Sequence, residues 1–216
     1  IFNSSEIMEV NVFNIKGKET GRKIKLDKAV FGIEPNNHAI YLDVKQHLAN
    51  RRQGTHKSKE RAEIVGSTRK IKKQKGTGTA RAGSIKNPLF KGGGRVFGPT
   101  PREYSQKVNK KVKRLARKSA LSIKAKQNSI VVLEDIQWNT AKTKNYLQML
   151  IALGLADKKS ILVLGDLNKN VYLSSRNLKN SKVVINSELN TYNISNANCL
   201  VFCESAFEEI ESILKR

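Results

Sequence analysis

The positive charge of this chain is concentrated in one internal segment, and this concentration limits what the segment can fold into. Residues 51 to 118 carry 22 lysine or arginine residues against 3 acidic residues. The whole chain of 216 residues carries 41 against 18. Like charges at this density repel one another, so the segment is not expected to form a compact core by itself. The chain is therefore expected to consist of a nearly neutral folded body and a basic appendage.

Glycine residues divide the first part of this segment, which has almost no apolar periodicity. Nine of the 14 glycines of the chain fall between residues 51 and 101. Such a stretch favours neither a helix nor a strand, and it buries too little apolar surface to offset its conformational entropy. We predict that residues 51–101 form a long extended loop that is ordered by a partner. Residues 1–50 and 102–216 should form the globular body, with residues 1–7, which precede Met8, as a candidate upstream extension.

Short apolar runs alternate with helical patterns in the rest of the chain. The expected strands are Val10–Ile15, Ser129–Leu133, Ile161–Gly165, Lys182–Asn186 and Leu200–Cys203. The expected helices are Asn37–Asn50, Ser105–Lys126, a helix capped by Thr140 that ends before Gly154, a short one at Ser174–Leu178, and a last one that opens with Ser205 and Glu208. Continuous apolar strands separated by helices are typical of parallel sheets. This alternation predicts an α/β fold with a mostly parallel sheet, and a Rossmann-like three-layer body is the favoured topology.

The two central helical patterns are expected to be amphipathic. In the first, Ile40, Tyr41, Val44 and Leu48 should form the apolar face. In the second, this face should contain Val108, Val112, Leu115, Ala116, Ala120 and Ile123. Cys199 and Cys203 are four residues apart, about 13 Å along a strand, which is too far for a disulfide. They are interpreted as buried free thiols in a reducing compartment.

The net charge of +23 indicates a polyanionic partner. A membrane surface is disfavoured because aromatic residues make up only 6% of the chain. No apolar run reaches the roughly 20 residues that span a bilayer, and no secretory signal precedes the body. We therefore expect a cytoplasmic protein that binds nucleic acid.

An enzyme with an α/β body and a basic insertion is the main alternative. Gly17 and Lys18 lack the upstream glycine and the following serine or threonine of a P-loop. Gly76, Gly78 and Gly83 do not join a strand to a helix, as a dinucleotide loop would. The pair Gly165 and Asp166 could form a cofactor turn, but a simple turn at the end of a strand is the favoured reading. His38, His47 and His56 are too widely spaced to form a metal set. The sequence predicts neither catalysis nor a cofactor or metal.

The basic segment has the chemistry of an RNA ligand. Lysine and arginine neutralise phosphates, and arginine can also bind them bidentately or stack on an unpaired base. Glycine lets the backbone approach closely. We expect phosphate contacts along the loop from Arg51, Arg52, Lys57, Arg61, Arg69, Lys70, Lys72, Lys73, Lys75, Arg81, Lys86, Lys91, Arg95 and Arg102. A basic helix face should add Lys107, Lys110, Lys111, Lys113, Arg114, Arg117 and Lys118, for which a solvated surface is the alternative.

Several groups of residues in this segment have the order and spacing of one protein family. They are Arg52 to Thr55, Arg61 to Glu63 with Gly66, Gln74 to Gly78 with Ala80, Arg81, Gly83 and Ser84, then Gly92 to Gly94, Val96 to Pro99, Pro101, Arg102, Tyr104, Ser105, Lys107, Asn109 to Lys111 and Arg114. This pattern resembles the loop and the following basic helix of the bacterial large-subunit ribosomal protein L-four family. The resemblance extends from about Met8 to the end of the chain and is strongest between Arg51 and Leu121. Arg176, Asn177 and Leu178 also fit it.

The resemblance implies a structural constituent of the large ribosomal subunit that binds 23S-type rRNA and supports early subunit assembly. It implies a Rossmann-like body near the surface of the subunit and a loop that reaches the peptide exit tunnel. The loop tip would line the tunnel beside ribosomal protein L-twenty-two and would meet the nascent peptide; other large-subunit proteins would be further partners. The tip residues would be Lys73, Gln74, Lys75, Gly76, Thr77, Gly78 and Thr79. Bacterial members often have an aromatic residue before the run from Gln74 to Gly78 and a basic residue after it, where this chain has Lys72 and Thr79.

Two other classes remain as alternatives. An RNA-modifying enzyme would need a glycine turn directly after the first strand and acidic contacts to a cofactor. Lys16 and Gly17 do not supply such a turn. A freestanding RNA chaperone or regulator would fit the charge but not the family pattern.

Overall fold

The structure, a computed structural model, describes residues 9–215. The candidate upstream extension, residues 1–7, lies outside the described residues. The chain forms two compact units. The body consists of the described residues up to His47 together with those from Lys107 onward, and the loop unit is Leu48–Gln106. No helix within residues 9–215 has the length and apolar character needed to cross a membrane.

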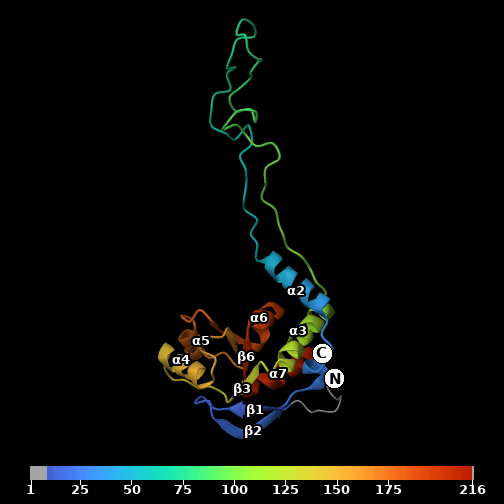
Figure 1. Ribbon diagram of the computed structural model, residues 1–216, viewed down its shortest axis with the longest axis vertical. Helices are drawn as coiled ribbons and strands as arrows, with labels where there is room; N and C mark the ends of the chain where they lie inside the picture. The colour runs from blue at the N-terminus through green and yellow to red at the C-terminus, as the bar shows by residue number, and fades with distance from the viewer. Residues whose placement is uncertain (1–8, 216) are drawn as a thin grey trace. The chain divides into compact units, whose positions relative to one another are not determined.

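The body has an α/β fold built on a mostly parallel sheet (Figure 1). Its strands are β1 (Glu9–Phe13), β2 (Glu19–Lys25), β3 (Ile130–Leu133), β4 (Ser160–Leu164), β5 (Ser181–Ile185) and β6 (Cys199–Cys203). They lie in the order β2-β1-β3-β6-β4-β5. Only β1 and β2 pair in the antiparallel direction. The prediction of a mostly parallel sheet from the alternation of strands and helices is confirmed.

The centre of the sheet is formed by the strands with the most continuous apolar sequence. Every residue of β4 and of β6 is buried. Val163 of β4 and Val132 of β3 both lie in register with Phe202 of β6. A strand buried on both faces requires apolar side chains at odd and even positions alike, which explains why these runs do not alternate. The five strands expected from the sequence are all present, with ends shifted by one or two residues.

The strand β2 was not expected from the sequence. It lies at an edge of the sheet, where it pairs with β1 and leaves most of its residues exposed. A half-solvated edge strand has no continuous apolar run, so its sequence, Glu-Thr-Gly-Arg-Lys-Ile-Lys, resembles that of a loop. A tight turn before it is held by the amide of Gly17, which donates to the carbonyl of Asn14 at 2.9 Å.

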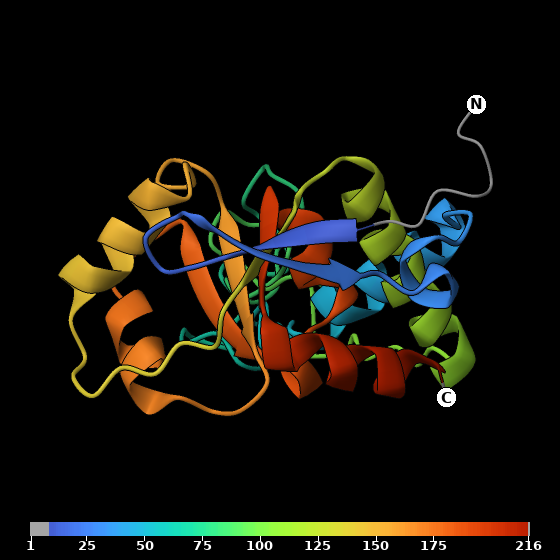
Figure 2. The ribbon, with the colours of Figure 1, turned by 90° about the horizontal axis from the view of Figure 1, so that it is seen from below.

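Seven helices and one 3-10 turn accompany the sheet in the described residues. They are α1 (Lys28–Phe31), α2 (Asn37–Asn50), α3 (Lys110–Lys126), α4 (Thr143–Ala152), α5 (Lys169–Ser175), the turn η1 (Asn186–Glu188), α6 (Thr191–Asn196) and α7 (Glu204–Lys215). Within the body, α3 packs on α1 and α6, α4 on α5, and α7 against β4 and β6. Figure 2 shows α4 and α5 together at one end of the sheet and α1 and α3 at the other.

The starts of two helices differ from the prediction, and at each start an amide bonds to a side chain that is distant in the sequence. The helix α4 begins after Lys142, not Thr140, and the Lys142 amide donates to Ser174 Oγ at 3.0 Å. The helix α7 begins at Glu204, and Ser205 does not form the expected capping box. Its amide and hydroxyl instead donate to Asp135 Oδ1, at 3.2 and 2.7 Å. The carboxylate of Asp135 thus accepts the bonds of a helix start 70 residues away.

Two short helices begin at asparagine caps that the apolar pattern did not reveal. The side chain of Asn168 accepts from the amides of Asn170 and Val171 and so starts α5. The side chain of Asn190 caps α6 in the same way. The short helix expected at Ser174–Leu178 is wrong, because α5 ends at Ser175. Each of these helices has at most seven residues, too few to establish an apolar period.

The expected apolar face of α2 is only partly correct: Ile40 packs against the core, and Val44 is half-buried. Tyr41 and Leu48 are exposed, whereas the buried residues of this helix are Ala39, Asp43 and Gln46. Asp43 is buried because its carboxylate accepts the hydroxyl of Thr191, at the start of α6, at 2.5 Å. A polar side chain can be buried as an apolar one is, provided that it has a hydrogen-bond partner. The spacing of apolar residues in the sequence does not reveal such a position.

The face expected for α3 is partly correct. Ala116 and Ala120 are buried, but Leu115 is exposed, and Val112 and Ile123 are only half-buried. The remaining buried positions are Ser119, Leu121, Ser122 and Ala125. The helix also starts five residues later than expected, at Lys110, so Val108 lies outside it. Small residues dominate the inward face because α1 and α6 both pack on it.

Both cysteines are buried and free, as the sequence predicts. Burial raises the pKa of the Cys203 thiol to about 12 and also raises that of Cys199. Both therefore stay protonated and act as small apolar side chains of β6.

A buried tyrosine gives the body a titration that can be measured at high pH. Tyr146 of α4 is fully buried, its hydroxyl lies 2.7 Å from Ser181 Oγ, and burial raises its pKa to about 12. The unfolded chain loses this proton above about pH 10, whereas the folded chain retains it. The stabilisation from Tyr146 is therefore complete below pH 10 and is lost between pH 10 and 12. It amounts to about 2–3 kcal/mol.

Urea unfolding of the wild type and of Tyr146→Phe at a series of pH values tests this titration. The variant should lose about 1 kcal/mol at pH 7, where it leaves Ser181 without its partner. It should also show a shallower decline in unfolding free energy above pH 10. Parallel pH profiles for the two proteins would show that Tyr146 does not titrate differently in the folded and unfolded chains.

Candidate nucleic-acid interface

The loop unit contains no helix or strand beyond the end of α2, yet its two arms are bonded to each other. The outgoing arm (residues 51–71) and the return arm (residues 83–106) are bridged by four backbone hydrogen bonds. These join the Arg102 amide to Gly54 at 3.2 Å, the Ser58 amide to Pro99 at 3.0 Å, the Arg95 amide to Lys59 at 3.0 Å and the Ile71 amide to Gly83 at 3.1 Å. The arms therefore form an irregular two-chain ribbon.

Some loop glycines allow the arms to approach closely. A Cβ on Gly54 would lie 2.0 Å from the Arg102 carbonyl oxygen, and one on Gly94 would lie 2.4 Å from the Arg61 nitrogen. A Cβ on Gly98 would lie 2.4 Å from that of Ser58. At these positions the absence of a side chain lets the two arms come into contact. In contrast, a Cβ on Gly76 or Gly78 would meet nothing within 4 Å, and both residues have positive φ.

The base of the ribbon is organised around Tyr104. The guanidinium carbon of Arg52 lies 3.8 Å from the centre of its ring, and that of Arg102 lies 4.7 Å from it. A hydrogen bond with Arg102 lowers the pKa of the Tyr104 hydroxyl, which also lies 3.4 Å from His56 Nε2. A guanidinium stacked on a ring retains donors at its edges, so both arginines remain able to bind phosphate.

Replacing Gly54 by alanine should open this base. The residue has φ of +64°, where alanine is strained, and the added Cβ would collide with backbone on the return arm. We expect the bond between Arg102 and Gly54 to break and the arginines to leave the Tyr104 ring. The ring-current shifts of the Arg52 side-chain protons should then collapse in NMR spectra.

Gly83→Ala is the matched control for this change, because a Cβ there meets nothing within 4 Å. It should leave the Arg52 shifts unchanged. Unaltered Arg52 shifts in Gly54→Ala would show that the two arms do not depend on this close approach.

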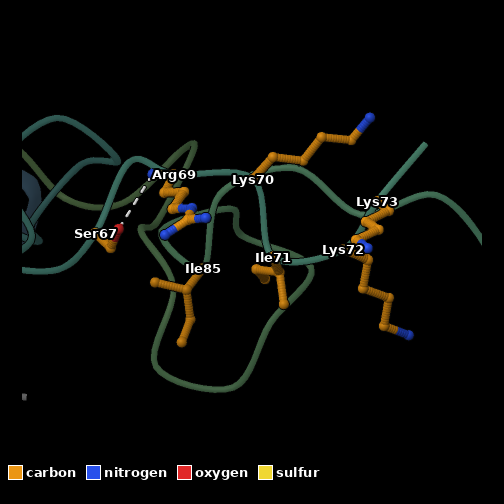
Figure 3. Close-up of a pocket in the computed structure, with 7 residues that line it drawn as sticks. All are labelled: Ser67, Arg69, Lys70, Ile71, Lys72, Lys73 and Ile85. Atoms are coloured by element: carbon orange, nitrogen blue, oxygen red, sulfur yellow. Dashed lines mark hydrogen bonds between the residues drawn. The ribbon is translucent and has the colours of Figure 1, made fainter.

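The closed end of the loop unit, residues 72–82, lies beyond the bridge between Ile71 and Gly83. Lys72 Nζ donates to Thr79 Oγ1 at 2.8 Å across it, and the Lys70 ammonium bonds to Gln74. An open hollow of about 680 Å³ lies beside it. In Figure 3 the stems of the lysines that line this hollow extend away from Ile71 and Ile85. The lysine ammonium groups are thus directed away from the two isoleucines, whereas the Arg69 guanidinium is drawn beside Ile85.

The loop residues expected to contact phosphate are all exposed except Lys86, which is half-buried. One of them, Lys57, is ion-paired with Glu63, which raises the pKa of the lysine. Glu63 is also the last acidic residue before Glu103, so residues 64–102 contain no acidic side chain. The prediction did not include Lys59, which is exposed beside the bridge to Arg95. Its charge and its place in the basic segment could have identified Lys59 as a further phosphate contact.

In the body, α3 presents only part of the basic face that was expected. Lys110 and Lys111 are exposed, and Lys113, Arg114 and Lys118 are half-buried. Lys107 lies before the helix, because Asn109 takes an extended conformation at its N-cap. Arg117 lines a small apolar crevice with residues of α6 and α7, and its Nε is buried without a partner among the described residues. Arg117 therefore faces the core more than the other basic residues that were expected on this helix face.

The carboxyl ends of β3, β6 and β4 border a hollow of about 240 Å³, at the position where doubly wound α/β folds bind nucleotides. Here the start of α7, the natural place for a phosphate, already donates hydrogen bonds to the carboxylate of Asp135. Asp166 adds a second carboxylate to the lining. Gly165 closes against Ser205, where a Cβ would lie 2.6 Å from the hydroxyl oxygen. The two carboxylates therefore disfavour the binding of a phosphate group at this edge of the sheet.

Comparison with known proteins identifies the family. A model of the ribosomal protein L4/L1 family matches residues 24–213. The chain belongs to this family. Its members are structural proteins of ribosomes and not enzymes. The match begins near the end of β2 and covers the loop unit and nearly all of the body that follows, so the basic segment lies within the family pattern.

Bacterial relatives match over nearly the whole chain. A protein of Christiangramia forsetii named large ribosomal subunit protein uL4 is 70% identical over 96% of this chain and its own full length. Proteins of the same name from Flavobacterium psychrophilum and Phocaeicola vulgatus are 69% and 60% identical. These two matches cover 97% and 96% of this chain and the full length of each relative.

Proposed function

We propose that this chain is a structural constituent of the large ribosomal subunit and that it binds 23S-type rRNA mainly through its loop unit. The observation that carries this proposal is the run of exposed lysine and arginine side chains in residues 64–102, which contain no acidic residue. Each cation that reaches a phosphate releases counterions, and this release drives association. The family and the names of the relatives support the same assignment.

In this proposal residues 1–50 and 102–216 form a Rossmann-like three-layer body, and residues 51–101 form an extended loop that penetrates the rRNA. The body docks early in assembly, and the rRNA folds around the loop. Contacts with phosphates supply the free energy that orders the loop. The four backbone bridges support this proposal, because they restrict the conformations of the arms and so reduce the ordering free energy that the phosphate contacts must supply.

The closed end is proposed to line the peptide exit tunnel beside ribosomal protein L-twenty-two. Residues Lys73 to Thr79 lie within it, and the open space around Gly76 and Gly78 supports close approach to another molecule. A photo-reactive amino acid at Thr77 should crosslink to L-twenty-two or to a stalled nascent peptide in purified ribosomes. The same group at Thr140, in the body, should crosslink to neither.

Fractionation of a lysate on sucrose gradients, followed by mass spectrometry, tests the function as a whole. The chain should be recovered with the large subunit in near one-to-one amount, at moderate and at high salt. An integral component resists salt because many phosphate contacts and surrounding RNA hold it. Recovery mainly in a free or salt-released pool would contradict the proposal and would favour a freestanding RNA-binding protein.

A further inference from the structure

The return arm presents a fully exposed phenylalanine. The side chain of Phe97 is 100% exposed, although aromatic side chains normally bury about 150–250 Å² of surface. Among the exposed large apolar residues of the chain it has the highest exposure within the described range. An aromatic ring held in water favours any partner that can cover it.

The backbone bridges hold this ring in a defined place. Lys59 and Ser58 are neighbours on the outgoing arm, yet their partners on the return arm, Arg95 and Pro99, are four residues apart. The residues between these partners, Val96, Phe97 and Gly98, therefore bulge out from the ribbon.

The two arms are in close contact on both sides of Phe97. Gly98 lies against Ser58, where even a Cβ would come within 2.4 Å. Gly94, just before the bulge, lies equally close to Arg61. The Phe97 side chain between these contacts is fully exposed.

The surroundings of the bulge indicate the chemistry of the partner. Arg95 borders the bulge, and its amide bonds to the carbonyl of Lys59 on the outgoing arm. The backbone of Glu60 and Arg61 lies against Gly94 just before the bulge, so cations outnumber the single acidic residue there, and the return arm itself has no acidic residue before Glu103. A partner must therefore combine negative charge with a flat apolar surface. An unpaired nucleotide has both, because its phosphate meets the cations and its base stacks on the ring.

We propose that Phe97 is a base-stacking residue that receives one unpaired base of the large-subunit rRNA. This inference rests on the proposed function and adds to it a contact that discriminates between RNA conformations. Phosphate contacts alone cannot tell a paired segment from an unpaired one, whereas a stacking residue needs a base that is free of its partner.

Three variants titrated with a transcript of bacterial large-subunit rRNA test this contact. Phe97→Ala should weaken binding about 5- to 150-fold, the range for loss of one stacked base, and leave the slope of affinity against salt unchanged. Phe97→Leu should recover little, because it lacks a flat ring. Phe97→Trp should bind as the wild type does, and its fluorescence should be quenched by the base. The wild type, whose one tryptophan is Trp138, provides the baseline.

Leu89→Ala is the matched control. Leu89 is an exposed apolar side chain of the same arm without a ring, so its removal should change affinity less than twofold. Unchanged circular dichroism and melting of every variant would show that the fold is intact, as expected for exposed positions.

Different failures have different meanings. Wild-type binding no tighter than to a non-ribosomal RNA of equal length would contradict the proposed function itself. Tight wild-type binding with an unaffected Phe97→Ala would overturn only the stacking contact. Full recovery by Phe97→Leu, or a defect seen only in assembled subunits and not with naked RNA, would indicate an apolar pocket on a neighbouring protein instead of a base and would also overturn it.

Discussion

Replacing Phe202 by alanine is expected to reduce the free energy of unfolding of the body by about 3–5 kcal/mol. Phe202 is fully buried in β6 between β3 and β4, and its ring centre lies 4.9 Å from that of Phe207. Its removal loses the transfer free energy of the ring and leaves a cavity that a central strand cannot close. Typical domains are stable by only about 5–15 kcal/mol, so the loss is a large share of the total.

Urea unfolding followed by circular dichroism measures this effect. Phe97→Ala is the matched control, since it removes the same side chain at a fully exposed position and should change stability by less than about 0.5 kcal/mol. Equal effects of the two substitutions would mean that β6 is not at the centre of the core.

Replacing Lys73, Lys75 and Arg81 together by glutamine is expected to weaken rRNA binding by roughly two orders of magnitude at about 0.15 M salt. All three side chains are exposed at the closed end of the loop unit. Each lost phosphate contact should also reduce the slope of log affinity against log salt by about 0.7–0.9. The three substitutions together should therefore lower the magnitude of this slope by about 2 to 3. Such a change distinguishes the loss of charge from a change in the conformation of the loop.

The control for this experiment removes the same charge elsewhere. Lys144, Lys158 and Lys179 are exposed lysines in the C-terminal half of the body. Their joint replacement by glutamine should leave the salt slope within about 0.5 of the wild type if the loop unit makes the phosphate contacts. Equal loss of slope in both triple variants would show that binding depends on overall charge and not on the loop.

The fold class could be predicted because the central strands have a strong local signal. The runs Ile161 to Leu164 and Leu200 to Cys203 are apolar at every position, which is typical of strands covered on both faces. The termination of α4 before Gly154 was also readable, since this glycine has φ of +67° and ends the helix as expected. These signals depend only on neighbours along the chain.

The errors occur where a distant partner replaces the local signal. Asp135, not Ser205, caps α7, and Ser174 takes the amide at the start of α4. The inner face of α2 is polar because Thr191 satisfies Asp43. No window of sequence contains both members of such a pair, so periodicity could not find them.

The candidate interface was likewise only partly predictable from the sequence. Its cations and glycines are evident from the sequence, but the roles of the glycines are not. Gly54, Gly94 and Gly98 bring the two arms together, whereas Gly76 and Gly78 lie in open space. The pairing of arms also shows which side chains are presented, and it separates Phe97 from the other apolar residues of the segment.

By itself the sequence determined the α/β class, the central strands, the buried thiols and the position of the positive charge, because these follow from composition and local period. The tertiary structure alone decided the edge strand β2, the distant hydrogen-bond partners at the starts of α4 and α7, the polar face of α2 and the orientation of Arg117 toward the core. It also decided the bridges that connect the arms of the loop unit. The physical reason is that hydrogen bonds and packing are satisfied by whatever group is near in space, and the chain brings together residues that are far apart in sequence.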